Sequence, residues 1–272
     1  MSEFEDSFIG FLQTHEIQHQ KEFHPIFQRQ VITAAQNVSF KLNKIGANSG
    51  LENKALWDLA KENQIKLIQI WEDLWLTKRE ISQSRVLAAL GKIKKIHGRE
   101  TSVVKINNNQ LIDFLEKNHL AIPLKGKHKF GLLYRDQLVT VISFSYPRNF
   151  GSGDQKIKSY EILRFCHVNG HSVVGGLSKL LKHFIENYKA DHLMTYIDKD
   201  WGDGEGFETI GFTKSNELAP GKFYIHPETK MRIQNISYHQ TENKLDSTEK
   251  YILAYNSGSL KYTKLTKAGE SI

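Results

Sequence analysis

The sequence contains a single cysteine, Cys166, and no long apolar run. One cysteine excludes an internal disulfide and any zinc site built from several cysteines, which is typical of proteins kept in a reducing compartment. A membrane-spanning helix needs roughly 18 to 20 apolar residues in succession, and no segment approaches that length. Three of the first six residues are acidic and none is basic, whereas a secretory signal peptide begins with basic residues. We therefore expect a cytoplasmic protein without a membrane partner.

Apolar residues make up 39% of the chain and aromatic residues 11%, which is enough to build a hydrophobic core. The formal charge of +7 favours a polyanionic partner such as DNA, because neutralised phosphates release counterions. An ordinary solvated surface would give the same pattern, so both interpretations stay open. The basic residues gather in two clusters: Lys92, Lys94, Lys95 and Arg99, and then Lys125, Lys127 and Lys129.

The first hundred residues read as a small separate unit. Apolar residues recur at helical spacing between residues 4 and 44, so we expect two helices and a loop there, with Phe27, Val31, Ile32 and Ala35 on the second helix. A helix at 53–63, a buried strand at 65–71 and a helix at 77–90 should follow. Residues 91–101 are basic and lack a period, which is typical of a linker. The expected domains are therefore 1–100 and 101–272.

The larger region alternates strands and helices. We expect a helix at 109–118 and a hairpin with strands at 130–134 and 138–144, joined by Arg135, Asp136 and Gln137. A strand at 160–167, a Gly-bearing turn, an amphipathic helix at 177–188, a strand at 193–197 and a short helix at 207–210 come next. Glycines at a strand-to-helix turn let backbone N–H groups approach a phosphate, so a pyrophosphate can bind there. Alternatively, Gly175 and Gly176 only allow the helix to pack closely.

This order of elements, together with residues 206–212 ending in Gly-Phe, resembles the acyl-CoA-binding half of the GNAT N-acetyltransferase superfamily. Residues 160–166, 172–181 and 255–262 are more narrowly similar to Mom-type DNA-modification acyltransferases and to GNAT-like domains associated with homing endonucleases. The resemblance implies an α+β fold in α/β/α layers, with a GNAT-like mixed central sheet and flanking helices behind a small, mainly helical N-terminal unit. It also implies acetyl-CoA or another acyl-CoA as cofactor.

The resemblance assigns provisional roles to individual residues. Cofactor binding falls on the turn, where the superfamily has Q/R-x-x-G-x-G/A, and here Ser172 and Leu177 replace the usual first and last residues of that pattern. The residues of the turn are Ser172, Val173, Val174, Gly175, Gly176 and Leu177. Phe207 stands where many members have a tyrosine that reprotonates the departing thiolate. Tyr196 and Tyr224 are the candidate replacements.

Acyl transfer needs a group that accepts the proton of the attacking amine. Glu161 and Asp198 are the candidate bases, and Arg164 would steady an anionic group. Glu161 and Arg164 face opposite sides of a regular strand, so both reach one site only if a β-bulge intervenes. A structural ion pair between them, and a strand-end cap at Asp198, are the alternatives. We expect N-acyl transfer onto DNA or a DNA-associated substrate, or else a non-catalytic nucleic-acid-binding protein that retains the fold.

Two further patterns lie in the N-terminal unit. Residues 67–75 and 94–99 resemble the tail of a very-short-patch-repair-like endonuclease, but the metal-binding residues of such enzymes are not recognisable in residues 1–52, so we expect no nuclease activity. Residues 15–19 spell H-E-x-x-H, which binds zinc when a helix places both imidazoles on one face. A solvated helix face is the alternative that we favour, and no bound metal is expected.

Overall fold

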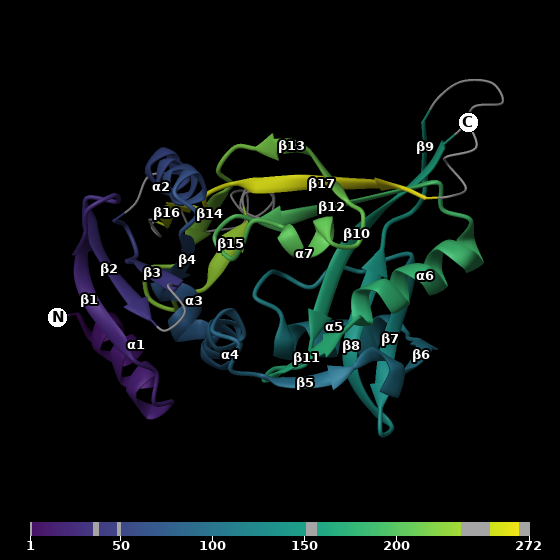
Figure 1. The fold of residues 1–272 in the computed structure, drawn as a ribbon, viewed down its shortest axis with the longest axis horizontal. Coiled ribbons are helices and arrows are strands. Elements are labelled where there is room, and N and C mark those ends of the chain that lie inside the picture. Colours follow the sequence, from purple (N-terminus) through teal and green to yellow (C-terminus); the bar gives the residue numbers. More distant parts are fainter. Residues whose placement is uncertain (1, 35–37, 48–49, 151–156, 235–250, 267–272) are drawn as a thin grey trace. The chain divides into compact units, whose positions relative to one another are not determined.

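The computed structural model describes residues 2–34, 38–47, 50–150, 157–234 and 251–266 (Figure 1). Contacts divide the chain into two compact units of three segments each. The first holds Met1–Gln83, Asp198–Asp203 and Glu217–Leu260, and the second holds Ser84–Ile197, Gly204–Asn216 and Lys261–Ile272. The sequence division at residue 100 stays a prediction. None of the helices in the described ranges is long and apolar enough to cross a membrane.

The first unit is built on a four-stranded sheet in the order β1-β2-β3-β4, in which β3 and β4 are parallel and the other pairs antiparallel. Its N-terminal elements are α1 (Glu3–Thr14), β1 (His19–His24), β2 (Arg29–Ala34), β3 (Val38–Asn43), α2 (Gly50–Glu62), β4 (Lys66–Trp71) and α3 (Glu72–Thr77). The chain passes into the second unit within α4 (Arg79–Ala89).

Helices α1 and α2 cover opposite faces of this sheet. Phe8 of α1 packs on Phe40, whose strand neighbours across the ladder are Ile32 and Ile68. Leu56 and other residues of α2 pack in a cluster with Val31 and Leu67, which precede those neighbours by one residue. Because successive residues of a strand point to opposite faces, the two helices lie on opposite sides.

The second helix expected before residue 44 is wrong, since the segment forms three strands. Pro25 lies in the turn between β1 and β2, and Gln28 has a left-handed φ of 49°, so the chain reverses here. Val31 and Ile32 are β-branched and suit the strand that follows. The helical spacing from Phe27 to Val31 was therefore coincidental. Ala35 lies outside the described residues. The helices expected at 53–63 and 77–90 and the strand at 65–71 are confirmed.

A small sheet completes the first unit, although its residues come from the far end of the chain. It has the order β15-β14-β16, from β14 (Lys222–Ile225), β15 (Arg232–Gln234) and β16 (Ile252–Tyr255). Ile225 and Ala254 pack on Trp71, and Arg232 forms an ion pair with buried Asp73 at 2.6 Å. Residues 219–258, which include this sheet, are an insertion between β13 and β17, two strands of the large sheet.

The large sheet has eight strands in the order β13-β17-β12-β10-β8-β7-β6, with β9 beside β10 (Figure 1). Strands β5 and β11 form a separate pair, and three helices among the residues described accompany the strands. In chain order the elements are β5 (Lys94–His97), β6 (Ser102–Lys105), α5 (Asn108–Asn118), β7 (His128–Tyr134), β8 (Gln137–Phe144), β9 (Arg148–Phe150), β10 (Ile157–His167), β11 (His171–Val174), α6 (Gly176–Tyr188), β12 (His192–Asp198), α7 (Glu205–Glu208), β13 (Thr213–Leu218) and β17 (Ser259–Leu265). The expected hairpin, strands and longer helices of this region are confirmed, and the short helix expected at 207–210 lies at Glu205–Glu208.

Helices α5 and α6 cover opposite faces of the large sheet. On β8, Val141 packs in the cluster of α5, whereas Phe144 stacks on Phe184 of α6 with ring centroids 3.7 Å apart. An odd residue separation along the strand puts these two side chains on opposite faces. The layers are therefore helix, sheet, helix, which confirms the expected α+β architecture with a mixed central sheet.

Residues 91–101 form ordered structure where we expected a linker. Strand β5 pairs in parallel with β11, which lies in the segment expected to be a turn, and a 3₁₀ helix (Gly98–Glu100) follows. Only Ile96 of β5 is buried, so the strand has no apolar alternation by which to recognise it.

Candidate functional site

The parallel strands β10 and β12 pair over a short stretch at the start of each strand. The ladder joins Ser159 to His192 and ends where Glu161 meets Met194. A β-bulge interrupts the pairing of β10 with β8 immediately afterwards, between Ile162 and Arg164. The bulge that would be needed to bring Glu161 and Arg164 to one side is therefore present. Beyond Glu161, the described residues of the two strands have no further ladder pairs with each other, so the strands diverge.

Arg164 lies at the divergence and is held by backbone carbonyls. Its guanidinium donates to the oxygens of Leu163 at 2.7 Å and of Ile122 at 2.8 Å, and its buried Nε has no hydrogen-bond partner among the described residues. Burial lowers the pKa of Arg164, and the charge of Glu161 opposes that effect. The two side chains form no ion pair in the described part of the chain, so the structural ion pair considered above is not observed.

The turn before α6 uses its two glycines in different ways. Gly175 precedes the helix with a left-handed φ of 74°, and a Cβ added there would meet nothing within 4 Å. A Cβ on Gly176 would lie 3.0 Å from Val173 and 3.1 Å from Leu132, so close packing requires this glycine. No side chain caps the N-terminus of α6. The packing interpretation therefore fits Gly176, whereas the space beside the Cα of Gly175 is empty and Gly98 packs against the carbonyl group of Gly175.

The remaining turn residues divide between strand and helix. Ser172 and Val173 belong to β11, and Val173 is buried, whereas Val174 is exposed. Leu177 is half-buried in the first turn of α6. Helix α6 connects the parallel strands β10 and β12. Such a helix begins near the carboxyl end of the first strand, and the carboxyl end of the second strand lies at the same edge of the sheet. The N-terminus of α6 therefore lies at the sheet edge toward which β10 and β12 diverge.

The other two candidate residues are on β12. Tyr196 belongs to the second unit and is 39% exposed. Asp198 ends the strand, belongs to the first unit and is exposed. Its Oδ1 accepts hydrogen bonds from the Asp200 amide at 3.1 Å and from Asn256 at 3.5 Å, which is the cap role considered as its alternative.

The strand also carries buried groups that limit the chemistry. Burial raises the pKa of the Cys166 thiol to about 12, so this cysteine stays protonated at neutral pH and is a core residue. Burial lowers the pKa of His167 to about 4, and its ring contacts the Thr140 hydroxyl at 2.8 Å. Phe207 packs on Phe212 and Tyr262, with ring centroids 5.4 and 6.3 Å away.

Sequence reasoning missed a polar network in the core of the first unit. Oδ1 of buried Asp200 accepts bonds from the Ser257 amide at 2.9 Å and hydroxyl at 2.6 Å, and Oδ2 accepts one from Trp71 at 2.8 Å. Gln69 donates to the Ser257 hydroxyl at 2.5 Å. The signal that could have revealed it is a polar Asn-Ser-Gly run directly after an apolar strand, at residues 256–258.

The H-E-x-x-H motif does not lie on a helix, so both earlier interpretations of it are wrong on that point. His15 follows α1 as its C-cap residue, Glu16 has a left-handed φ of 52°, and His19 starts β1. The chain direction changes between the two histidines, so they lack the one-turn spacing that a zinc-binding helix provides. The described residues contain no group of three His, Cys, Asp or Glu side chains that could hold a metal ion.

No protein-family model matches the sequence, and no curated protein matches it. Among solved structures, Arabidopsis thaliana Naa50 in complex with a bisubstrate analogue is 14% identical with a TM-score of 0.40, covering 61% of this chain and 99% of that chain. The ribosomal-protein-S18-alanine N-acetyltransferase from Escherichia coli is 10% identical with a TM-score of 0.37, covering 63% and 98%.

A third similar structure is Eis1 from Mycobacterium abscessus, which is 10% identical with a TM-score of 0.36 over 46% of this chain. The match spans only about a third of that protein's length, 34%. At such low identities and TM-scores, the likeness itself assigns no activity to this chain.

Proposed function

We propose that the second unit is an acyl-CoA-dependent N-acyltransferase of the GNAT type. The observation that carries the proposal is the coincidence of three features at one sheet edge: the divergence of β10 and β12, the bulge beside Arg164, and the uncapped N-terminus of α6. Diverging strands expose backbone N–H and C=O groups that can bind an extended amide-containing arm. A helix N-terminus attracts phosphate through its free N–H groups.

The proposed residues divide the work as follows. Backbone N–H groups from Gly175 to Leu177 bind the pyrophosphate, and acetyl-CoA or another acyl-CoA supplies the activated acyl group when bound. Glu161 accepts the proton of the attacking amine as the N–C bond forms and the C–S bond breaks. Tyr196 returns a proton to the departing sulfur, since Phe207 has none to give. Arg164 holds an anionic group of the cofactor or substrate near the bulge.

Isothermal titration with acetyl-CoA tests the phosphate site, and the chain offers a matched control. Gly170 and Gly175 both have a φ of 74° and no atom within 4 Å of an added Cβ, so Asp causes the same backbone strain at either position. We expect Gly175→Asp to abolish binding by placing a carboxylate at the pyrophosphate position, and Gly170→Asp to bind like the parent. Equal binding by both variants, or none by the folded parent, would contradict the proposal.

A second experiment separates chemistry from binding. Glu161→Gln and Tyr196→Phe should each lower the rate of acyl transfer at least tenfold, the lower range for loss of a general acid or base, while leaving the Kd for acetyl-CoA within about twofold. Glu186→Gln, on the exposed face of α6, is the control and should have no effect. A rate unchanged in both site variants would remove the acid and base assignments. Asp198→Asn should likewise leave the rate unchanged.

We propose DNA or a DNA-associated amine as the acceptor, because basic and exposed aromatic side chains gather around the start of β7, the end of β8 and the neighbouring strand β9. Burial lowers the pKa of His128, and four lysines lower it further. Tyr146 is 68% exposed beneath the Lys127 ammonium, and Phe150 is 50% exposed beside Arg148 on β9. The four lysines around His128 are Lys105, Lys127, Lys129 and Lys158. Exposed aromatic rings among cations are suited to stacked bases and phosphates.

The same group of basic and aromatic side chains favours a second candidate function, a non-catalytic nucleic-acid-binding protein. Affinity for single-stranded DNA should then fall with salt by about 0.7 log units per tenfold change for each phosphate contacted. Tyr146→Ala should weaken binding by an amount that does not depend on salt, whereas Lys127→Ala should reduce the slope. Binding of DNA without binding of acetyl-CoA would select this candidate. The Mom-type subclass and the nuclease-related origin of residues 53–100 stay predictions.

A further inference from the structure

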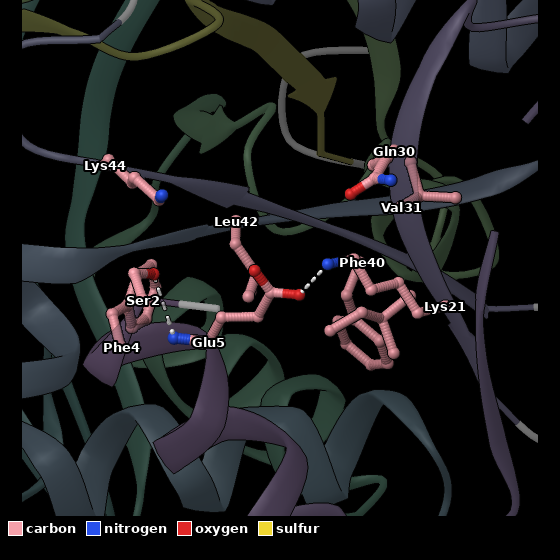
Figure 2. A pocket seen from close by; sticks show the side chains of 10 residues that line it. Ser2, Phe4, Glu5, Lys21, Gln30, Val31, Phe40, Leu42 and Lys44 are labelled. Atoms are coloured by element: carbon pink, nitrogen blue, oxygen red, sulfur yellow. Dashed lines mark hydrogen bonds and ion pairs between the residues drawn. The ribbon is translucent and has the colours of Figure 1, made fainter. Parts of the chain in front are cut away.

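The first unit contains a pocket of about 190 Å³ where α1 begins, lined by α1 and by residues of β1, β2 and β3. Its acid, among the described residues that line it, is already paired. Figure 2 shows the Glu5 carboxylate inside the pocket with the Lys21 ammonium against it, and the Glu5 amide donates to the Ser2 hydroxyl at 3.4 Å. The basic cluster at residues 92–99, in the second unit, contains cations that lack such partners.

This basic cluster lies on β5, which pairs in parallel with the strand that leads into the proposed pyrophosphate site. Lys95 lies opposite Ser172 of β11, and His97 lies opposite Val174. Partners across a ladder point to the same face of a sheet, and so do alternate residues along a strand. Lys95 therefore shares a face with the residues that immediately precede the turn before α6.

The chain after β5 runs along the first turn of α6. Lys179 of this helix donates to the Gly98 carbonyl at 2.9 Å and also to the Thr101 carbonyl. A Cβ added to Gly98 would lie 3.3 Å from the carbonyl carbon of Gly175. Arg99 lies between the two carbonyl groups that Lys179 holds, and it is exposed. The backbone of Arg99 is thus fixed beside the start of α6.

The surface around these two cations has the character of a nucleotide site. Lys95 and Arg99 are exposed and form no ion pair with any described residue. Glu100, the acid next in sequence, instead accepts a hydrogen bond from the His97 amide at 3.3 Å. Val174, on the same face as Lys95, is 48% exposed. Unpaired cations suit phosphates, and an apolar side chain beside them suits a base.

We propose that Lys95 and Arg99 bind the 3′-phosphate of acyl-CoA, so that the chain selects this cofactor over its 3′-dephospho form. The inference rests on the proposed function, because the pyrophosphate must first bind at the start of α6. The ribose that carries the pyrophosphate also carries the 3′-phosphate, so the two groups lie close together in the cofactor. A phosphate monoester has a charge of about −1.5 to −2 at neutral pH, which two cations neutralise, and the guanidinium donates two parallel hydrogen bonds to it.

The test compares acetyl-CoA with acetyl-3′-dephospho-CoA, which differ only in this phosphate, by isothermal titration into the whole chain. At low ionic strength we expect the parent to bind acetyl-CoA about tenfold more tightly, and the preference should narrow as salt rises, because exposed charges are screened. The double variant Lys95→Gln, Arg99→Gln should reduce the preference to about twofold or less. Its affinity for the dephospho form should stay within about twofold of the parent's.

The matched control removes the same number of charges from the same segment. Lys94 shares the opposite face of β5 with buried Ile96, and Lys92 precedes the strand. The double variant Lys92→Gln, Lys94→Gln should therefore keep the preference for acetyl-CoA. All four positions are exposed, so both double variants should unfold at the temperature of the parent within about 2 °C.

The outcomes separate this inference from the proposed function. Equal affinity of the parent for the two cofactor forms would overturn the inference and leave the cofactor site in place. A preference that survives in the Lys95 and Arg99 variant, or that is lost to the same extent in the control, would also overturn it. If the folded parent binds neither form, both the inference and the proposed function are contradicted.

Discussion

At the scale of the residue, Asp200 organises the core of the first unit. Its carboxylate accepts bonds from two groups of Ser257 and from the Trp71 indole, all inside the protein. Burial raises the pKa of this carboxyl, and the hydrogen bonds from Ser257 and Trp71 act against that effect. The side chain thus links β4 to the insertion between β13 and β17, since its two partners, Trp71 and Ser257, are 186 positions apart in the sequence.

Replacing this carboxylate should destabilise the protein strongly. Asp200→Ala leaves the Trp71 and Ser257 donors buried without an acceptor, and we expect the free energy of unfolding to fall by about 2 to 4 kcal/mol. Urea denaturation measures this. Asp203→Ala, three residues later, removes a partly exposed ion pair with Lys61 and should cost about 0.5 kcal/mol. Similar losses in the two variants would contradict the structural role of Asp200.

His167 should make the stability depend on pH. Its pKa in the folded chain is about 4, below the ordinary value of 6.5, so between these values the unfolded chain binds a proton that the folded chain does not. The contribution of His167 to the free energy of unfolding should therefore fall as the pH decreases from 6.5 to 4 and change no further below that. The loss should be on the order of 2 kcal/mol, since the half-buried ring keeps some contact with water.

The comparison of parent and His167→Gln isolates this effect from other titrating groups. The difference between their free energies of unfolding should narrow as the pH falls through the window, because glutamine takes up no proton. Urea denaturation at several pH values gives both curves. Parallel curves would show that His167 does not titrate as described.

At the scale of the element, the β7–β8 hairpin departs from the turn chemistry that its geometry favours. Arg135 and Asp136 have φ values of 48° and 61°, which defines a two-residue turn with both residues left-handed. Such turns prefer Asn followed by Gly. The sequence allowed the hairpin to be predicted from two apolar runs, although the connection is one residue shorter than expected.

Converting this turn to Asn-Gly should stabilise the protein. We expect the double variant Arg135→Asn, Asp136→Gly to raise the free energy of unfolding by about 1 kcal/mol and the Tm by about 3 °C, because it relieves backbone strain at two positions. Part of the gain is offset by losing the Arg135 contact with the Tyr134 ring, 5.1 Å away. Differential scanning calorimetry measures the change. The double Ala variant should lower the Tm, and a gain there would contradict this account of the turn.

The elements predicted from sequence are those with a clear period and enough length. Helix α6 was recognisable because Leu180, Leu181 and Phe184 recur on one buried face. Strand β5 and its partner β11 were missed because each is four residues long with one buried side chain, so pairing across the fold decides their structure. The sequence did not predict the bulge at Leu163 itself, but it did indicate that a bulge is required for Glu161 and Arg164 to reach one site. The pocket beside α1 was not predicted, since it depends on three strands lying in register.

At the scale of the whole molecule, the first unit depends on segments that are remote in sequence. Asn53 donates to the Tyr255 carbonyl at 2.9 Å, and Asp73 pairs with Arg232. We therefore expect residues 1–100, produced alone, to lack cooperative thermal unfolding, because these buried groups would have no partners. Circular dichroism during heating and amide hydrogen exchange test this against the whole chain. A fragment that unfolds cooperatively with protected amides in β4 would establish that residues 1–100 form an independent domain.

The insertion between β13 and β17 also determines when each unit can fold during synthesis on the ribosome. Trp71 is translated 186 residues before Ser257, an interval of roughly 10 to 40 s at typical elongation speeds. During that time the nascent first unit has an unfilled polar core, and the strands of the second unit are made before β17 can join the large sheet. Neither unit can complete its fold until residues 252–265 have been synthesised. We therefore expect the growing chain to bind chaperones that hold unfolded segments, rather than to fold one domain after the other.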